Sequence, residues 1–301
     1  MKKMRLPLLI VLGVGVIGII LGSFFDFQIS SAIANAKSGL GLTISAIGPT
    51  IGFMAVALMG GGFIAFGLKK DYHIVLRIGF FVLAACCFAV SIIYPSGEYF
   101  GVNGFYWVAP KWVGYFIVIL PEAAAVVGGY FLFRNCENAK MWIIFCVVIG
   151  ILLLALLVVI PTIKDNMRRP RYRAIANEAY VGITFHQWWE PCKDYKDLMA
   201  INNIESSDHF KSYPSGHSAE ASILLVAATF FPMADKKFQK YQLPAFLASS
   251  GVVLLVMFAR ILAAAHFLSD VSWGMSIVVL LTFIANEVVM RVKPLQVEEA
   301  E

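Results

Sequence analysis

Long uncharged stretches constrain this chain more than any other feature of its sequence. Five stretches of 19 to 31 residues contain no Asp, Glu, Lys or Arg: Leu6–Phe25, Ser38–Leu68, Ile78–Gly97, Met141–Ile163 and Tyr241–Ala259. Because a helix rises about 1.5 Å per residue, each stretch can cross a hydrocarbon core of roughly 30 Å. With 59% apolar and 14% charged residues and a mean hydropathy of +0.77, the chain cannot be a soluble enzyme, a secreted disulfide scaffold or a disordered protein. The sequence predicts an integral membrane protein.

The apolar pattern predicts an all-α polytopic bundle of about eight transmembrane helices. The expected spans are residues 6–25, 44–68, 74–94, 112–133, 141–163, 216–234, 243–263 and 269–290. The last two are divided because one helix over residues 243–290 would measure roughly 70 Å, more than twice the hydrocarbon thickness. A reversal is therefore expected where Arg260, His266, Ser269 and Asp270 interrupt the apolar sequence.

The first span could instead be a signal peptide. Basic residues precede its apolar stretch, and Ala34-Asn35-Ala36 resembles a cleavage site. The stretch is long for a signal peptide and the candidate cleavage site lies far beyond it, which favours a membrane span.

The distribution of lysine and arginine predicts the orientation of the bundle. The side that holds both termini carries twelve of them: Lys2, Lys3, Arg5, Lys69, Lys70, Arg134, Lys140, Lys236, Lys237, Lys240, Arg291 and Lys293. The two shorter loops on the other side carry only Lys37 and Lys111, and the long segment 164–213 is largely exempt from the positive-inside rule. The termini are therefore expected in the cytoplasm and segment 164–213 outside it. This segment has too few apolar residues for us to expect a separate core, and its Phe185, Trp188 and Trp189 are expected either to anchor it at the membrane interface or to pack on the surface.

Three polar groups lie at expected outer boundaries of the membrane. The first places five cations within ten residues at the exit of the fifth span: Lys164, Arg168, Arg169, Arg171 and Arg173. Such cations are commonly solvated or bound to lipid headgroups. The other outer flanks of this chain avoid lysine and arginine, which favours a binding function here.

The second group, Tyr213-Pro214-Ser215-Gly216-His217-Ser218, opens the sixth span. Ser215 can cap a helix, and Gly216 lets backbone N–H groups approach an anion. His217 would project where it can give a proton to a leaving oxygen. The alternative is an ordinary helix start that carries an interfacial histidine.

The third group contains Arg260, His266 and Asp270 at the expected reversal. If the chain is helical from His266 onward, Asp270 lies one turn away on the same face. A carboxylate there can hold one imidazole nitrogen and leave the other free as a nucleophile. A stabilising ion pair is the alternative. The fifth span ends, the sixth begins and the seventh ends on one side of the membrane, so the three groups can meet.

Together these groups resemble the three-part signature of the type 2 phosphatidic acid phosphatase family, which is related to vanadium haloperoxidases. The second part, P-S-G-H, is complete in this chain at residues 214–217. The third part, S-R-x5-H-x3-D, matches Arg260, His266 and Asp270, with Ala259 at the serine position.

The first part of the signature, K-x6-R-P, is the least complete. Lys164 and Arg171 have the required spacing, but Tyr172 replaces the proline. The alternative pairing on Arg169-Pro170 keeps the proline and loses the lysine spacing, so we prefer Arg171.

The resemblance implies a six-span helical core with two additional spans, and residues 1–140 are expected to form the N-terminal helices and 141–301 the catalytic part. It implies that His266 is the nucleophile that forms a phosphohistidine, that Asp270 orients it and that His217 is the general acid. It also implies that the phosphate is bound by Lys164, Arg171, Ser215, Gly216 and Arg260, with no metal or other cofactor.

The implied activity is hydrolysis of a lipid phosphate or isoprenoid diphosphate, of the phosphatidic acid, phosphatidylglycerol phosphate or undecaprenyl diphosphate type, on the extracytoplasmic face of a bacterial plasma membrane. A role in lipid metabolism of the cell envelope follows from that expectation. Two alternatives stay open: a phosphotransferase that uses the same first half-reaction, and a non-catalytic transporter of anionic lipids. The expected partners are the lipid substrate and the bilayer. The sequence has no nucleic-acid-binding signature and does not indicate an oligomeric state.

Overall fold

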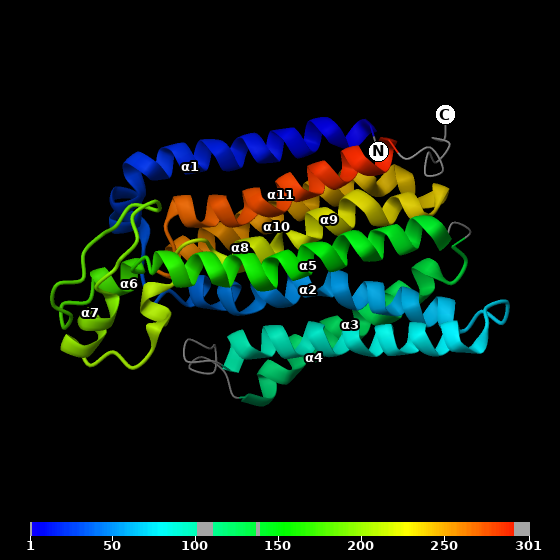
Figure 1. Cartoon of the computed structure of the whole chain (residues 1–301), viewed down its shortest axis with the longest axis horizontal. Helices are drawn as coiled ribbons and strands as arrows, with labels where there is room; N and C mark the ends of the chain where they lie inside the picture. The colour runs from blue at the N-terminus through cyan, green and yellow to red at the C-terminus, as the bar shows by residue number, and fades with distance from the viewer. Residues whose placement is uncertain (1, 101–110, 137–138, 292–301) are drawn as a thin grey trace.

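The computed structural model describes residues 2–100, 111–136 and 139–291, and these residues form helices and connecting segments without strands. Within them, seven helices are long and apolar enough to cross a membrane. They are α1 (Arg5–Ile33), α2 (Gly39–Gly67), α3 (Ile74–Phe100), α4 (Lys111–Phe133), α5 (Ala139–Met167), α10 (Gln242–Leu262) and α11 (Leu268–Arg291). The predicted all-α polytopic membrane bundle is confirmed (Figure 1). Lys293, which contributed to the predicted orientation, lies outside the described residues.

The sixth predicted span is divided into short helices. It consists of α8 (Gly216–Ala221), α9 (Ile223–Phe230) and the 3₁₀ turn η4 (Phe231–Ala234), and a second 3₁₀ turn, η5 (Lys236–Tyr241), leads into α10. Ser222 separates α8 from α9, and its hydroxyl donates to the carbonyl of Ser218 at 2.7 Å. A serine that bonds to the preceding turn in this way commonly bends a helix.

Helix α1 lies along α11 over most of its length (Figure 1). Three glycines of α1, Gly15, Gly18 and Gly22, face serines of α11. A Cβ at Gly18 would lie 2.2 Å from Ser272 Oγ. Small residues let two membrane helices approach closely. At the N-terminal end of α1, Arg5 forms an ion pair with Glu287. This packing supports the interpretation of the first span as a membrane helix.

Helix α2 connects the N-terminal helices to the rest of the bundle. It packs against α3 and α4 on one side and against α8 on another. Gly52 makes the second contact possible, because a Cβ at this position would lie 2.3 Å from the Glu220 carbonyl oxygen. Elements far apart in sequence therefore meet beside α8.

The segment between α5 and α8 has a small core of its own, which the sequence analysis did not expect. It contains α6 (Tyr172–Ile175), α7 (Tyr195–Ile201) and the 3₁₀ turn η3 (Ser207–Phe210). Six apolar side chains from different turns converge in it: Ala174, Ile183, Cys192, Leu198, Ile204 and Phe210. The expectation was wrong because these residues are scattered in sequence and are brought together only by the turns.

The aromatic residues of this segment fall into two groups. Phe185 packs on the ring of Phe267 at 5.2 Å, and Trp188 donates to Ser23 Oγ of α1 at 2.9 Å. Trp189 is 48% exposed. Phe185 and Trp188 therefore attach the segment to the bundle, and only Trp189 keeps the exposure expected of an interfacial anchor.

Candidate active site

A tight reversal joins α10 to α11 and presents His266. Ala264 has a positive φ of 56°. The amide of Ala265 donates to the Arg260 carbonyl at 3.1 Å, and the amide of Ala264 donates to the Ile261 carbonyl at 2.9 Å. This pair of hydrogen bonds is the Schellman motif, with alanine at the position that glycine usually occupies. The motif fixes His266 within four residues of the end of α10.

The ring of His266 is fully buried, and a backbone carbonyl is its hydrogen-bond partner. Its Nδ1 lies 2.6 Å from the carbonyl oxygen of Ser212. Because a carbonyl can only accept, Nδ1 must carry a proton. Nε2 has no hydrogen-bond partner among the described residues. A neutral His266 therefore has its free lone pair on Nε2, as a nucleophile requires.

Asp270 contacts the surroundings of His266 more closely than it contacts the ring. The distance from Asp270 Oδ2 to His266 Nδ1 is 3.9 Å, which is too long for a direct hydrogen bond. Oδ2 instead accepts from Ser212 Oγ at 2.5 Å and from the Phe267 amide at 2.9 Å. The direct orienting contact expected from the sequence is replaced by Ser212, which holds the ring through its carbonyl and Asp270 through its hydroxyl.

Members of all three predicted polar groups line one cavity of about 130 Å³, although His266 and Asp270 of the third group are buried behind its lining residues. Its charged and histidine lining comes from the exit of α5 and the residues after it, from α8 and from the end of α10, together with one acidic residue of η3. These lining residues include Lys164, Arg171, Asp208, Gly216, His217, Glu220 and Arg260. Residues separated by almost one hundred positions thus surround one anion-sized space.

Ser215 is placed differently from the other residues expected to bind phosphate. It is fully buried and does not line the cavity, and its hydroxyl caps α8 by accepting from the Ser218 amide at 3.4 Å. Its own amide donates to the Asp270 carbonyl at 3.0 Å. Ser215 therefore positions the start of α8, and Gly216 is the member of the pair that faces the cavity.

The structure separates the two candidate arginines of the first group. Arg171 lines the cavity, where its Nη2 lies 2.7 Å from Asp208 Oδ1. Arg169 is completely buried away from the cavity and pairs with Asp270 Oδ1 at 2.5 Å. The lysine spacing and not the proline thus identified the arginine at the cavity.

Asp208 pairs with two arginines at the edge of the cavity. Its second oxygen, Oδ2, lies 2.9 Å from Arg173 Nη2. Burial alone would raise the pKa of Asp208, but Arg171 and Arg173, followed by Lys164, hold it well below its usual range. Asp208 therefore stays ionised and offsets part of the positive charge that would bind a phosphate.

The same cations act on His266. Burial, and after it the charges of Arg260, Arg171 and Lys164, lower the pKa of His266 well below 6.5, although Asp270 opposes this shift. The histidine is therefore neutral over the physiological range, in the protonation state in which Nε2 can attack an electrophile.

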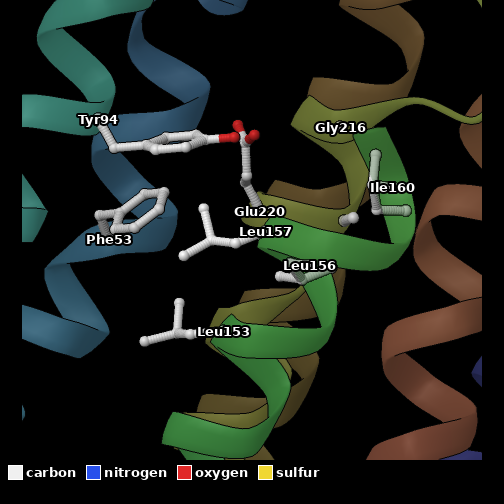
Figure 2. Close-up of a pocket in the computed structure, with 9 residues that line it drawn as sticks. Phe53, Tyr94, Leu153, Leu156, Leu157, Ile160, Gly216 and Glu220 are labelled. Carbon is white, nitrogen blue, oxygen red and sulfur yellow. The ribbon is translucent and has the colours of Figure 1, made fainter. Parts of the chain in front are cut away.

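The N-terminal helices contribute directly to the site. Ser45 and Ala46 of α2 and Tyr94 of α3 line the cavity. Next to it lies an apolar crevice lined by Phe53 of α2 and by leucines 153, 156 and 157 of α5, and Tyr94 and Glu220 border both spaces. Figure 2 shows the Tyr94 hydroxyl and the Glu220 carboxylate pointing toward each other at the head of this crevice. The polar cavity thus adjoins an apolar crevice.

Sequence reasoning missed several residues of the site: Asp26, Tyr94, Asp208 and Ser212. Asp26 had a usable signal, because it is an acidic residue inside an apolar helix, where charge is costly and usually functional. It was overlooked because it ended the first uncharged stretch. The sequence offers no comparable signal for Ser212, whose role depends on its backbone carbonyl.

Comparison with known proteins agrees with this geometry. No curated protein and no solved structure matches the chain. The family model described as PAP2 superfamily matches residues 142–293, which is half of the chain and contains all three polar groups. The protein therefore belongs to the PAP2 superfamily, as the three motifs predicted.

Proposed function

We propose that this protein is a membrane phosphatase that hydrolyses a lipid phosphate or isoprenoid diphosphate through a phosphohistidine. Membership of the PAP2 superfamily supports a phosphoric ester hydrolase acting on lipid-like substrates. The observation that carries the finer proposal is the cavity lined by Lys164, Arg171, Arg260 and His217, whose three cations also act on the buried ring of His266. Guanidinium groups bind phosphate oxygens through paired hydrogen bonds and stabilise the charge that spreads over them in the transition state.

The first half-reaction gives each of the two histidines one role. His266 Nε2 attacks phosphorus, and the bond between phosphorus and the leaving oxygen breaks. His217 gives a proton to that oxygen, so the lipid alcohol, or the lipid monophosphate from a diphosphate, leaves without a full negative charge on the bridging oxygen. In the second half-reaction water attacks phosphorus, His217 takes a proton from the water, and the bond between phosphorus and Nε2 breaks to release phosphate.

The apolar crevice supports an amphiphilic substrate. A phosphate in the cavity would direct the adjoining part of its tail toward Phe53, Leu153 and Leu157, which are apolar side chains of the membrane-spanning helices α2 and α5. The head and tail of the substrate would then contact the family region and the N-terminal helices at the same time. Glu220 and Tyr94 would lie where the phosphate joins the tail.

The proposed location is a bacterial plasma membrane with cytoplasmic termini and an extracytoplasmic site in segment 164–213 and its neighbours. The ion pair between Arg5 and Glu287 holds the start of α1 beside the end of α11. In Figure 1 the α6–α7 segment lies at the opposite end of the bundle. The cations of the loops then favour the termini as the cytoplasmic side.

The test is a substrate panel with the purified protein in detergent and a chelator present. Wild type is expected to release phosphate from a long-chain lipid monophosphate or an isoprenoid diphosphate, and His266→Ala is expected to release none while keeping the wild-type melting temperature. A newly phosphorylated lipid or sugar without free phosphate would identify a phosphotransferase. Binding without any cleavage would identify a non-catalytic lipid-binding protein. Undiminished turnover by His266→Ala would refute the assigned nucleophile.

A further inference from the structure

Two buried carboxylates share Arg169 beneath the candidate site. Arg169 Nη1 contacts Asp270 Oδ1 at 2.5 Å, and its Nη2 contacts Asp26 Oδ2 at 2.9 Å. All three side chains are fully buried. The guanidinium also lies 4.4 Å from the ring of Phe267, directly after His266. Asp26 belongs to α1, which lies entirely outside the region that matches the family model.

Asp26 also holds the start of α11. Its Oδ1 accepts from the Ser269 amide at 2.9 Å, and its Oδ2 accepts a short hydrogen bond from the Ser269 hydroxyl. Ser269 Oγ in turn lies 2.9 Å from Arg169 Nη1. The carboxylate of Asp26 therefore fixes both the backbone that follows His266 and the arginine that holds Asp270.

We infer that Asp26 is a positioning residue of the phosphatase site, which acts on His266 through Arg169, Ser269 and Asp270. This inference rests on the proposed function. Asp270 holds Ser212, whose carbonyl binds His266 Nδ1, so the chain of contacts from α1 to the nucleophile is continuous. Helix α1 thereby takes part in the chemistry although Asp26 lines no part of the cavity that would hold the phosphate.

The packing of α1 explains how Asp26 reaches this depth. The glycines of α1 allow its backbone to approach α11, and at Gly22 a Cβ would lie 2.6 Å from the Ser269 amide nitrogen and 2.7 Å from Asp26 Oδ1. A side chain at Gly22 would occupy the space through which the two helices exchange these hydrogen bonds. The contacts of Asp26 with α11 therefore require glycine at position 22.

The test compares Asp26→Asn with Glu287→Gln in the full-length protein. Both variants neutralise an acidic residue that links α1 to α11, but Glu287 lies at the opposite end of the helices. Asp26→Asn is expected to lower kcat by about 10- to 100-fold, the range found for outer partners of metal-bound histidines, with KM changed less than about twofold. Glu287→Gln is expected to keep wild-type kcat.

A double-mutant cycle tests the route. If Asp26 acts through Arg169, adding Asp26→Asn to the Arg169→Gln variant should lower kcat by less than about twofold further. Wild-type kcat in Asp26→Asn, an equal loss in Glu287→Gln, or independent losses in the double mutant would overturn the inference. If Asp26→Asn does not fold, Gly22→Ala displaces the carboxylate without removing its charge and is expected to lower kcat, with Gly13→Ala as its control because no atom lies within 4 Å of a Cβ at Gly13.

A spectroscopic measurement separates this inference from the proposed function. The imidazole ¹⁵N shifts of His266, assigned with His266→Asn, are expected to change in Asp26→Asn and to stay unchanged in Glu287→Gln. A wild type that releases no phosphate but shows these shifts would refute the proposed function and support the coupling. An active wild type whose shifts and kcat are unaffected by Asp26→Asn would refute the coupling alone.

Discussion

At the scale of single residues, the two neighbouring arginines Arg169 and Arg171 have opposite environments. Arg171 faces the cavity and is shared with Asp208, whereas Arg169 is enclosed with Asp26 and Asp270. Removing one partner from a buried ion pair leaves an uncompensated charge and costs about 3–5 kcal/mol. Replacing Arg171 should therefore affect mainly activity, and replacing Arg169 should affect mainly stability.

Replacing each arginine tests this difference. Arg171→Ala is expected to lower kcat/KM by about 10² to 10³, the effect of losing one donor from a preorganised oxyanion site, with little change in melting temperature. Arg169→Met is expected to lower the melting temperature strongly, because Asp26 and Asp270 would remain buried without their cation. Thermal unfolding in detergent and phosphate release measure the two effects, and a stable Arg169→Met with weakened phosphate binding would reverse the assignments.

The lowered pKa of His266 predicts how the site responds to acid. A histidine attacks phosphorus only when it is neutral, and a pKa below 6.5 keeps it neutral as the pH falls through that value. The ring is therefore expected to protonate only well below pH 6.5. A titration of its ¹⁵N signals measures this without interference from the second ionisation of the substrate, which itself lies near pH 6. A midpoint at or above 6.5 would contradict the lowering of the His266 pKa by burial and by the surrounding cations.

At the scale of elements, the backbone of the α10–α11 reversal was beyond sequence reasoning although its location was predicted. The length of the apolar sequence and the polar residues within it indicated a turn near His266. Nothing in Ala263-Ala264-Ala265 indicated a left-handed residue, because this conformation costs alanine about 1–2 kcal/mol and glycine is the usual choice. The surrounding contacts, such as that of the Arg173 amide with the Ala264 carbonyl at 2.9 Å, hold this conformation in place.

Glycine substitutions at this reversal test the conformation. Ala264→Gly is expected to raise the free energy of unfolding by about 1 kcal/mol, because glycine adopts positive φ without strain. Ala263→Gly is the matched control, since Ala263 is equally buried but has a φ of −73°, and it is expected to destabilise by roughly 0.5–1 kcal/mol. Equal effects of both substitutions on the melting temperature would contradict a left-handed residue at Ala264.

The glycines of α1 give a prediction for the contact between helices. Gly18→Val is expected to separate α1 from α11 and to reduce both stability and activity, because its Cβ would overlap Ser272 Oγ. Gly13→Val lies on the same helix with open space around it and is expected to have little effect. Melting temperature and phosphate release check both variants, and equal tolerance of valine at the two positions would contradict the close packing.

At the scale of the whole molecule, the sequence indicated the class of fold and the family. It did not indicate every helix that contributes residues to the site. Spans and motifs follow from local patterns, namely apolar length and residue spacing. The contributions of Asp26, Ser45 and Tyr94 depend on how helices pack, and a single sequence contains no pairing information for them. The interrupted sixth span was missed for a similar reason, since Ser222 is compatible with an uninterrupted helix.

The orientation of the bundle can be tested by chemical labelling. In a variant without its native cysteines, Val181→Cys, at a side chain that is 69% exposed in the segment between α5 and α8, is expected to react with a membrane-impermeant maleimide added to intact cells. Lys240→Cys, in η5, is expected to react only after permeabilisation. The reverse pattern would place the candidate site on the cytoplasmic side.

The apolar crevice lies between α2, α3 and α5, and this origin has a consequence for how such proteins diversify. The groups proposed to handle phosphorus come from one half of the polypeptide, while Phe53, which would contact the hydrocarbon tail of the substrate together with the leucines of α5, comes from the other. Exchanging the N-terminal helices among relatives would thus change which amphiphile binds and leave the residues proposed to act on phosphorus in place. Asp26 sets the limit on such an exchange, since any replacement would have to supply its own acid to Arg169.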